Sequence, residues 1–299
     1  MYMEIVSQVV QSGVSSYAHT KGFAETEVLK DIKKHLNIMS SEYYSGNDPN
    51  INYQDPLCRL GYLHRYAPAH ATLFEHVLRD SDEISLRKLY ADRWVLNICA
   101  VGGGPGTELL GIAKYLVPRV QWMPRKIGFT VLDKVPHWSA DWQHLADVIE
   151  NYFYSSLEGS GMQPPTFAPS FLPFDVFNEE QYGSHAYHFH QADIVIFNYL
   201  FSENKTRLSD AYNVVNRLAE LASPDCTFVV IDRQEKAGTF TSDVVELFRS
   251  VFGEKVKGVT YNGTLDPDEE KSNMGELLET LGPPHLQFEA FWLVAKVNG

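Results

Sequence analysis

The chain has 299 residues, of which 44% are hydrophobic, and its formal net charge is −13. This length allows one large domain, or one domain and part of a second, and the composition is that of a globular protein. The negative charge opposes an extended nucleic-acid surface, and without an apolar window of about eighteen residues no membrane span is expected.

Cysteine usage and the first residues favour an intracellular protein. Cys58, Cys99 and Cys226 are too few and too scattered for a disulfide framework or a zinc cluster. Residues 1–16 have neither a basic start nor a long apolar core, so no secretory signal is expected. We therefore expect a cytoplasmic or nuclear protein without a metal site, and its acidic surface leaves a protein partner open.

Residues 1–92 are expected to form an N-terminal helical cap. Apolar side chains at helical spacing predict a helix over Glu25–Met39, and the polar stretch Ser40–Pro56 predicts a loop. Leu57–Leu78 again has a helical stripe, which Pro68 is expected to break or restart.

This last stretch concentrates polar aromatic and basic residues. Tyr62, His64, Arg65, Tyr66 and His70 lie within nine residues. One interpretation is a helix laid over a ligand site, with Arg65 or Tyr66 reaching the ligand; the other is a packing helix with aromatic core residues. The histidines are six residues apart rather than four, so they do not indicate a metal site.

The central feature of the sequence is a glycine-rich turn. The apolar run Val95–Val101 ends at this turn, and a helical pattern begins at Thr107, which predicts strand, turn and helix. Glycines permit positive φ and close approach of a ligand, and the helix start offers free N–H groups to an anion. The alternative is a tight turn that binds nothing. The spacing is G-x-G-x-G followed by Thr-Glu, which fits neither the dinucleotide fingerprint nor a P-loop. The glycines are Gly102, Gly103, Gly104 and Gly106.

The remaining elements alternate as in an α/β protein. Strands are expected over Gly128–Asp133, within Ala192–Glu203, and over Thr227–Asp232, Val256–Tyr261 and Leu286–Val297. Helices are expected over Pro136–Tyr154, Leu208–Ala222 and Val244–Phe252, and loops over Ser155–Pro173 and Asn262–Pro284.

The run Gly102-Gly103-Gly104-Pro105-Gly106-Thr107-Glu108 resembles motif I of the class I S-adenosylmethionine-dependent methyltransferases. The next predicted strand ends in Asp133, where that family has an acid that accepts hydrogen bonds from the ribose hydroxyls. The segment Phe171–Phe177 resembles the third motif, where Asp175 and its neighbours would meet the adenine. Asp175 as an ordinary turn residue is the alternative.

One position departs from the family pattern. An acid often stands two residues before the first glycine, and this chain has Ala100 there. Contact with the methionine amino group must then come from backbone carbonyls, from Glu108 or from another group.

The resemblance implies a Rossmann-like α/β fold over residues 93–299, with a seven-stranded, mostly parallel sheet and helices on both faces. It implies S-adenosylmethionine as the cofactor. Asn198 and Tyr199 fall at the carboxyl end of a strand and are expected to orient or stack on the acceptor. The expected cofactor-binding residues are Gly102, Gly103, Gly104, Gly106, Glu108, Asp133, Lys134, Asp175, Val176, Asn198, Arg65 and Tyr66.

A finer resemblance is to fungal-type ribosomal-RNA uridine-N3 methyltransferases, carried by the glycine run and by Leu60–Pro68. It implies an RNA acceptor, with a base nitrogen as the methylated atom. Two alternatives stay open: a methyltransferase acting on a small molecule or a protein, and a cofactor-binding scaffold or sensor without catalysis. Ala100 and the lack of a dedicated catalytic signature keep the second one open.

Overall fold

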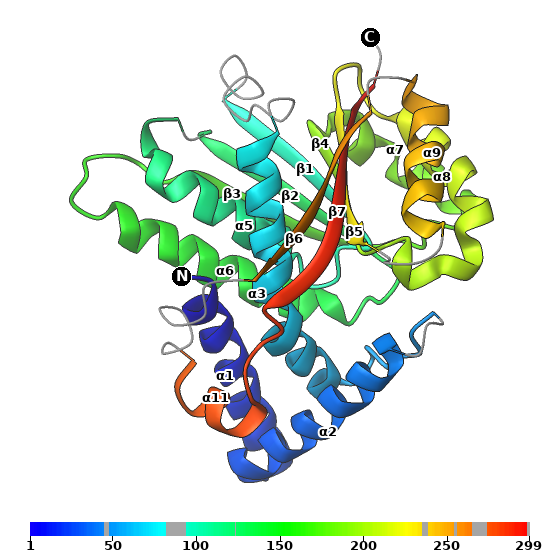
Figure 1. The fold of residues 1–299 in the computed structure, drawn as a ribbon. Coiled ribbons are helices and arrows are strands. Elements are labelled where there is room, and N and C mark those ends of the chain that lie inside the picture. The colour runs from blue at the N-terminus through cyan, green and yellow to red at the C-terminus, as the bar shows by residue number, and fades with distance from the viewer. Residues whose placement is uncertain are drawn as a thin grey trace.

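The computed structural model of the protein describes residues 1–44, 48–81, 94–122, 124–234, 239–253, 256–264 and 274–297. These residues form a sheet of seven strands with helices on both faces and a group of helices at one end (Figure 1). The predicted Rossmann-like α/β fold is confirmed. None of the helices within these ranges is long and apolar enough to cross a membrane.

The sheet has the order β3-β2-β1-β4-β5-β7-β6. The first five strands run parallel, and β7 is antiparallel to both of its neighbours. The order in which successive strands are added to the sheet reverses between β1 and β4. Sheets of this type bind ligands at the point of reversal. The strands are β1 (Val95–Val101), β2 (Lys126–Asp133), β3 (Thr166–Pro173), β4 (Ile194–Asn198), β5 (Thr227–Arg233), β6 (Lys257–Thr264) and β7 (Gln287–Lys296).

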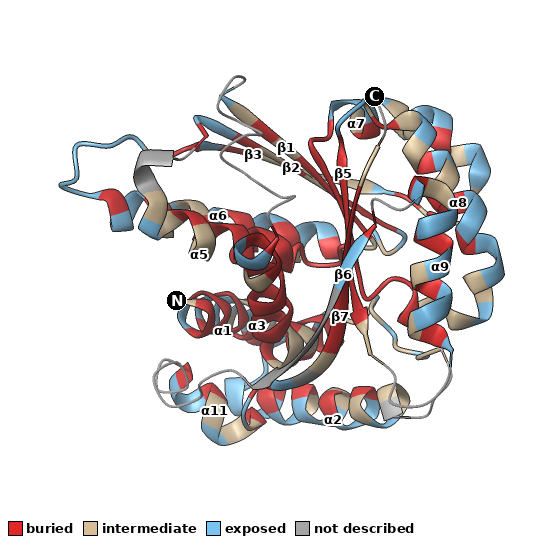
Figure 2. Cartoon of the chain, turned by 45° about the horizontal axis from the view of Figure 1, so that its top comes forward, coloured by how far each residue is buried: buried red, intermediate tan, exposed pale blue. Residues whose placement is uncertain are grey.

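Helices cover the two faces of the sheet unequally (Figure 2). One face is covered by α5 (Thr107–Leu116) and α6 (Trp138–Leu157), which are backed by α1 (Tyr2–Lys21) and α3 (Pro56–Asp80). The other face carries α7 (Tyr182–Gln191), α8 (Leu208–Leu221) and α9 (Phe240–Phe252). The remaining helices are α2 (Glu25–Tyr44), α11 (Gly275–Leu281) and the short η1 (Val117–Trp122), η2 (Glu179–Gln181) and η3 (Ser202–Arg207).

The N-terminal helices share one hydrophobic core with the sheet. Buried side chains continue from α1 through α3 and α5 to the strands, and Tyr2 at the start of the chain is completely buried. The Tyr2 hydroxyl donates to Oε2 of Glu75 on α3 at 2.5 Å. The two helices α3 and α5 meet closely at Gly111, where the backbone of α3 leaves no room for a side chain.

Replacing Gly111 with alanine is expected to destabilise the fold by roughly 1–3 kcal/mol, as overpacking does. The new Cβ would lie 2.5 Å from the carbonyl oxygen of Ala71, and a backbone atom cannot rotate away. Gly183→Ala in α7 is the matched control, because a Cβ there meets nothing within 4 Å. Chemical denaturation of both variants measures the difference, and equal stabilities would contradict the close helix contact.

Two helix predictions need correction. Helix α2 continues to Tyr44, through residues predicted to be a loop. Helix α3 runs without a break through Pro68. Proline removes one intrahelical hydrogen bond and costs about 3 kcal/mol in a helix interior. Here the neighbouring turns are deeply buried, with Leu63, Ala67 and Ala71 fully enclosed, and this packing outweighs the loss.

The loop predicted over Ser155–Pro173 was wrong in its second half, which forms β3. Its prolines argued against a strand. However, β3 lies at the edge of the sheet and pairs only with β2, with Pro169 opposite Phe129. An edge strand tolerates proline because it has only one neighbour to bond. Helix α7 was not predicted. Part of the predicted 262–284 loop forms α11, and residues 265–273 lie outside the described residues.

Candidate functional site

The glycine-rich turn joins β1 to α5 and depends on left-handed backbone angles. Gly102, Gly104 and Gly106 have φ values of 65°, 50° and 71°. A Cβ on Gly106 would also overlap the ring of Trp142 from α6. Side chains other than glycine rarely adopt these angles, so the sequence of this turn follows from its shape. The turn brings backbone N–H groups to the carboxyl edge of the sheet.

Asp133, the last residue of β2, holds this turn in place. Its Oδ2 accepts a hydrogen bond from the N–H of Gly104 at 2.9 Å, and its Oδ1 accepts one from the N–H of Val135 at 2.8 Å. The side chain is 8% exposed. Burial raises the pKa of this carboxyl, while the two backbone bonds lower it. Each carboxylate oxygen can accept further hydrogen bonds, so Asp133 can also serve hydroxyl groups of a ligand.

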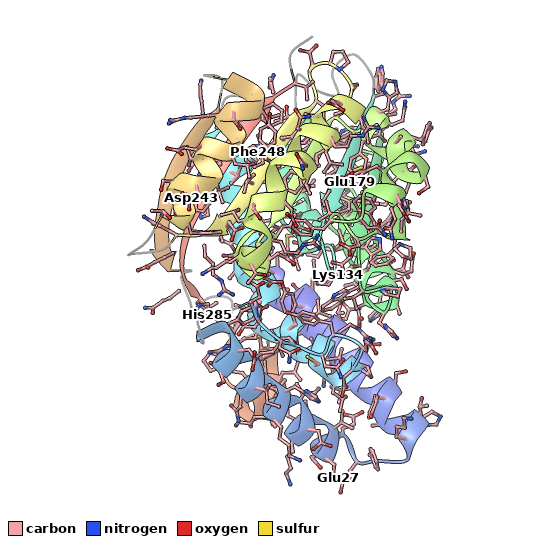
Figure 3. The ribbon with its side chains drawn as sticks, turned by 90° about the vertical axis from the view of Figure 1, so that its right-hand side faces the viewer. Glu27, Lys134, Glu179, Asp243, Phe248 and His285 are labelled. Carbon is pink, nitrogen blue, oxygen red and sulfur yellow. The ribbon has the colours of Figure 1, made fainter. Side chains whose placement is uncertain are left out.

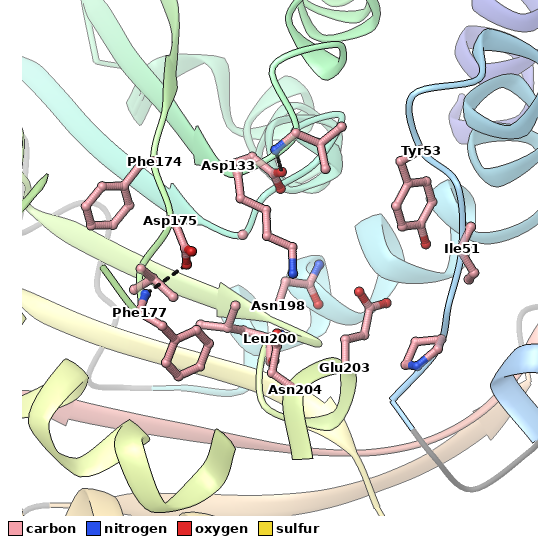
Figure 4. Close-up of a pocket in the computed structure, with 15 residues that line it drawn as sticks. Ile51, Tyr53, Asp133, Phe174, Asp175, Phe177, Asn198, Leu200, Glu203 and Asn204 are labelled. Carbon is pink, nitrogen blue, oxygen red and sulfur yellow. Dashed lines mark hydrogen bonds between the residues drawn. The ribbon is translucent and has the colours of Figure 1, made fainter. Parts of the chain in front are cut away.

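A cavity that is partly open to solvent lies at the carboxyl ends of β1, β2 and β4 (Figure 4). Sites for small molecules and cofactors are concave, and in parallel sheets they lie at this edge. Figure 3 shows Lys134 between the sheet and the N-terminal helices. The lining residues are Pro49, Ile51, Tyr53, Gly102, Asp133, Lys134, Val135, Phe174, Asp175, Val176, Phe177, Asn198, Leu200, Glu203 and Asn204.

A buried polar pair stands behind the cavity wall. Nδ2 of Asn198 on β4 donates to Oε1 of Glu108 on α5 at 2.5 Å. Glu108 is 1% exposed and Asn198 9% exposed. Among the described residues, Oε2 of Glu108 and Oδ1 of Asn198 have no hydrogen-bond partner. Burial raises the pKa of Glu108 to about 7. Because buried polar atoms normally have partners, two unpaired acceptors beside a cavity indicate a ligand that donates, such as an ammonium group.

The structure brings many of the predicted site residues together and places others elsewhere. Gly103, Gly104 and Gly106 form the turn behind the cavity, and Gly104 is bonded to Asp133. The predicted residues that line the cavity are Gly102, Asp133, Lys134, Asp175, Val176 and Asn198.

Gly103, Gly104, Gly106 and Glu108 stand behind the cavity wall, and three further predicted residues also lie outside the cavity lining that the described chain forms. Tyr199 stacks on His70, with ring centroids 4.3 Å apart. Tyr66 packs edge-on against Tyr43. Arg65 donates to the carbonyl of Pro283, and its own carbonyl accepts from His285.

The geometry of α3 explains the position of Arg65. Tyr62, Tyr66 and His70 follow one another at intervals of four residues, so they share one face of the helix. On this face the ring of Tyr66 contacts the rings of both Tyr62 and His70. Arg65 falls beside that face and meets the segment before β7. The arginine therefore contacts a backbone carbonyl rather than the cavity.

Several lining residues were not predicted as site residues. Pro49, Ile51 and Tyr53 come from the segment between α2 and α3, and Glu203 and Asn204 come from η3. The only local signal was for Glu203, an acid just beyond the carboxyl end of β4. Nothing in the sequence indicates that the segment containing Tyr53 meets this edge of the sheet.

Comparison with known proteins identifies a family for the chain. Residues 19–246 match the model of a family described as "Putative SAM-dependent methyltransferase". No curated protein matches the sequence.

Solved structures with similar folds include three methyltransferases. A SAM-dependent methyltransferase from Methanosarcina mazei has 8% identity and a TM-score of 0.42, covering 72% of this chain and 97% of its own. A SAM-dependent methyltransferase from Archaeoglobus fulgidus has 10% identity and a TM-score of 0.38, with 76% and 94% covered. The CurJ carbon methyltransferase has 14% identity and a TM-score of 0.45, with 98% and 71% covered. At this similarity none of them bears on the acceptor.

Proposed function

The chain belongs to this family of S-adenosylmethionine-dependent methyltransferases, and from this premise we propose that its acceptor is a ring nitrogen of an RNA base. Cations beside the cavity support the proposal, although the whole chain is acidic. Lys134 lines the cavity, and the guanidinium of Arg207 lies 4.2 Å from the ring centre of Phe177, another lining residue. Local cations of this kind can meet phosphates next to a bound base.

The residues of the cavity fit the cofactor of this family. When bound, S-adenosylmethionine supplies an electrophilic methyl group on a sulfonium. The glycine turn leaves space for the ligand against the backbone, and Asp133 would accept from the ribose hydroxyls. Asp175 and Val176 would meet the adenine. The unpaired oxygens of Glu108 and Asn198 would accept from the methionine ammonium group, which compensates for the missing acid at Ala100.

Positioning is the main task of these residues. Holding the acceptor nitrogen close to the methyl group in this cavity converts a slow bimolecular displacement into a fast local one. Tyr53 and Phe177 supply flat apolar surfaces in the cavity wall for a planar acceptor.

A small-molecule acceptor is the second candidate. Pro49, Ile51 and Tyr53 close one side of the cavity and limit the space for a long polymer. To separate the two, the enzyme is incubated with labelled S-adenosylmethionine and cellular RNA, small-molecule or protein fractions. We expect the label in RNA, and mass spectrometry of its nucleosides identifies the methylated base. Label found only in another fraction would reject the RNA acceptor.

The Glu108→Gln variant is expected to bind the cofactor roughly tenfold more weakly at pH 7.5, since hydrogen bonds to charged groups contribute about 1.5–3 kcal/mol. The pKa of Glu108 is raised to about 7, so its carboxylate ionises as the pH rises through that value. Affinity of the wild type for the cationic cofactor should therefore increase from pH 6 to pH 7.5.

Calorimetry across this pH interval measures the effect, and the glutamine variant should show a flatter profile. Glu220→Gln serves as the control, because Glu220 is a surface acid paired with Arg217 on α8. A wild-type affinity that does not change with pH would contradict the role of Glu108.

A further inference from the structure

Glu203 is a carboxylate at the cavity that cofactor binding does not use. It lies in η3, just beyond the end of β4, and its side chain is half-buried. Figure 4 shows its carboxylate between Asn198 and Tyr53. Asn198 belongs to the pair proposed to hold the cofactor, whereas Tyr53 belongs to the segment that closes the opposite side. Glu203 therefore stands between the cofactor side of the cavity and the space left for an acceptor.

The backbone that carries Glu203 is firmly held. Its N–H donates to the carbonyl of Tyr199 at 3.2 Å. The buried Asp232 at the end of β5 accepts from the N–H groups of Phe201 and Ser202 at 3.0 and 3.1 Å. These bonds fix the turn after β4, so the position of the carboxylate is set by the sheet itself.

Tyr43 bonds to the carboxylate from the other side, and Tyr53 bonds in turn to Tyr43. The Tyr43 hydroxyl, at the end of α2, donates to Oε1 of Glu203 at 2.9 Å. The Tyr43 and Tyr53 hydroxyls lie 2.8 Å apart and form a second hydrogen bond. The guanidinium of Arg233 lies 4.4 Å from the ring centre of Tyr43. A carboxylate with one oxygen bound by a tyrosine and its side chain facing the cavity is arranged to receive a proton.

Resting on the proposed function, we propose that Glu203 is the base that removes the proton from an acceptor ring N–H, and that Tyr43 positions it. This choice narrows the acceptor class. A ring nitrogen with an available lone pair needs no base to be methylated. A ring N–H between two carbonyls has its lone pair delocalised and must lose its proton first. The carboxylate therefore favours an imide-type N–H in a planar ring.

The proposed methyl transfer conserves atoms and charge. The N–H bond breaks, and its proton forms an O–H bond with the Glu203 carboxylate. The electron pair left on nitrogen forms the new N–C bond to the methyl group, while the S–C bond breaks and its electrons stay on sulfur. The sulfonium and carboxylate charges disappear together, leaving a methylated ring, a thioether and a protonated Glu203 that returns its proton to solvent.

Charged groups from several elements tune the base. Burial is the largest influence and raises the pKa of Glu203 to about 7; Asp232 and Asp133 raise it further, whereas Arg233 and the hydrogen bond from Tyr43 lower it. The tyrosines Tyr53, Tyr62 and Tyr199 also face this carboxylate. At a pH above about 7 the group is ionised and can accept a proton.

The test uses the Glu203→Gln variant of the 299-residue chain with cellular RNA and labelled cofactor at a concentration that saturates the enzyme at every pH between 5.5 and 8.5. General bases contribute roughly 10²–10⁴-fold, so we expect methyl transfer to fall at least about a hundredfold. The wild-type rate should rise with pH up to about 7 and then level, and the glutamine variant should lack this rise. Cofactor affinity measured by calorimetry should change less than about threefold, well below the tenfold effect of losing a charged hydrogen bond.

Two further variants separate a base from a structural residue. Tyr43→Phe removes a bond that lowers the pKa of Glu203, so the midpoint of the rate profile should move to higher pH. Asp48→Asn is the control, because Asp48 also joins the segment before α3 to η3, through Thr206, but does not line the cavity. It should leave the profile unchanged.

Stability gives a readout that is independent of activity. Because the pKa is raised in the folded protein, the protonated group stabilises the fold at low pH, and this contribution is lost as the pH rises through about 7. Denaturation should therefore show that the wild type loses stability relative to Glu203→Gln between pH 5.5 and 8.

The outcomes are distinct for the two proposals. Wild-type enzyme that methylates RNA, together with a glutamine variant that keeps its rate and pH profile, would overturn the role of Glu203 alone. Wild-type enzyme that labels no RNA at any pH would reject the proposed function, and the inference with it. An unchanged profile in Tyr43→Phe would reject the positioning role of the tyrosine.

Discussion

Gly104→Val is expected to abolish cofactor binding, with a loss of affinity of at least about a hundredfold, or roughly 2.7 kcal/mol. Gly104 has φ of 50°, and its N–H donates to Asp133. A β-branched residue is a genuine outlier at such an angle. The turn would leave its present path, and the cavity wall and the bond to Asp133 would change together.

The matched control for this substitution is Gly159→Val. Gly159 has φ of 78° in the loop after α6, with open space around its Cβ position, so it carries a similar backbone cost away from the cavity. Calorimetry with the cofactor and denaturation of both variants are the measurements. Binding by Gly104→Val as tight as that of the control would show that the turn is not part of the cofactor site.

Asp133→Ala is expected to weaken cofactor binding by at least about tenfold, since each charge-assisted hydrogen bond contributes roughly 1.5–3 kcal/mol. The structure adds a second effect. The carboxylate also pairs the N–H groups of Gly104 and Val135, and unpaired buried donors cost about 1–3 kcal/mol. The variant should therefore melt at a lower temperature even without the cofactor.

Asp147→Ala provides the comparison, because Asp147 is an exposed acid on α6 that bonds only to Gln143 among the hydrogen bonds described for it. Thermal denaturation with and without cofactor separates the two effects. If Asp133→Ala binds normally and melts at a lower temperature, the residue has a purely structural role in holding the turn.

Local patterns predicted the centre of the fold well. The strand Val95–Val101 and the start of α5 at Thr107 have the predicted bounds, because an apolar run, a glycine turn and a helical stripe follow one another directly. Strand β3 was missed because its prolines are acceptable only at a sheet edge, and edge position depends on the whole sheet. The helix break predicted at Pro68 was wrong for a related reason, because the burial that stabilises α3 depends on the tertiary structure.

In the candidate site, too, local patterns predicted some residues, whereas the positions of others depend on the tertiary structure. Asp133 and Asn198 stand at the ends of predicted strands and do line one cavity, because parallel strands bring their carboxyl ends to a common edge. Asp175 lines the same cavity, but only the family resemblance indicated it, since the strand before it was not predicted. The bond between Glu108 and Asn198 joins residues ninety positions apart, and no spacing rule predicts it. The positions of Tyr53 and Arg65 depend on how the N-terminal helices pack on the sheet.

The packing of the N-terminal helices on the sheet also determines whether the chain can be cut into parts that fold separately. Leu109 and Ile112 of α5 are completely buried in the core that α1 and α3 complete. A fragment beginning near residue 93 would carry these apolar side chains into water and would lack the wall of the cavity that holds Tyr53. Such exposed apolar surfaces promote aggregation. A substitution in the N-terminal helices that alters the acceptor pocket therefore also alters the stability of the whole protein. This coupling constrains how the enzyme can evolve toward new acceptors.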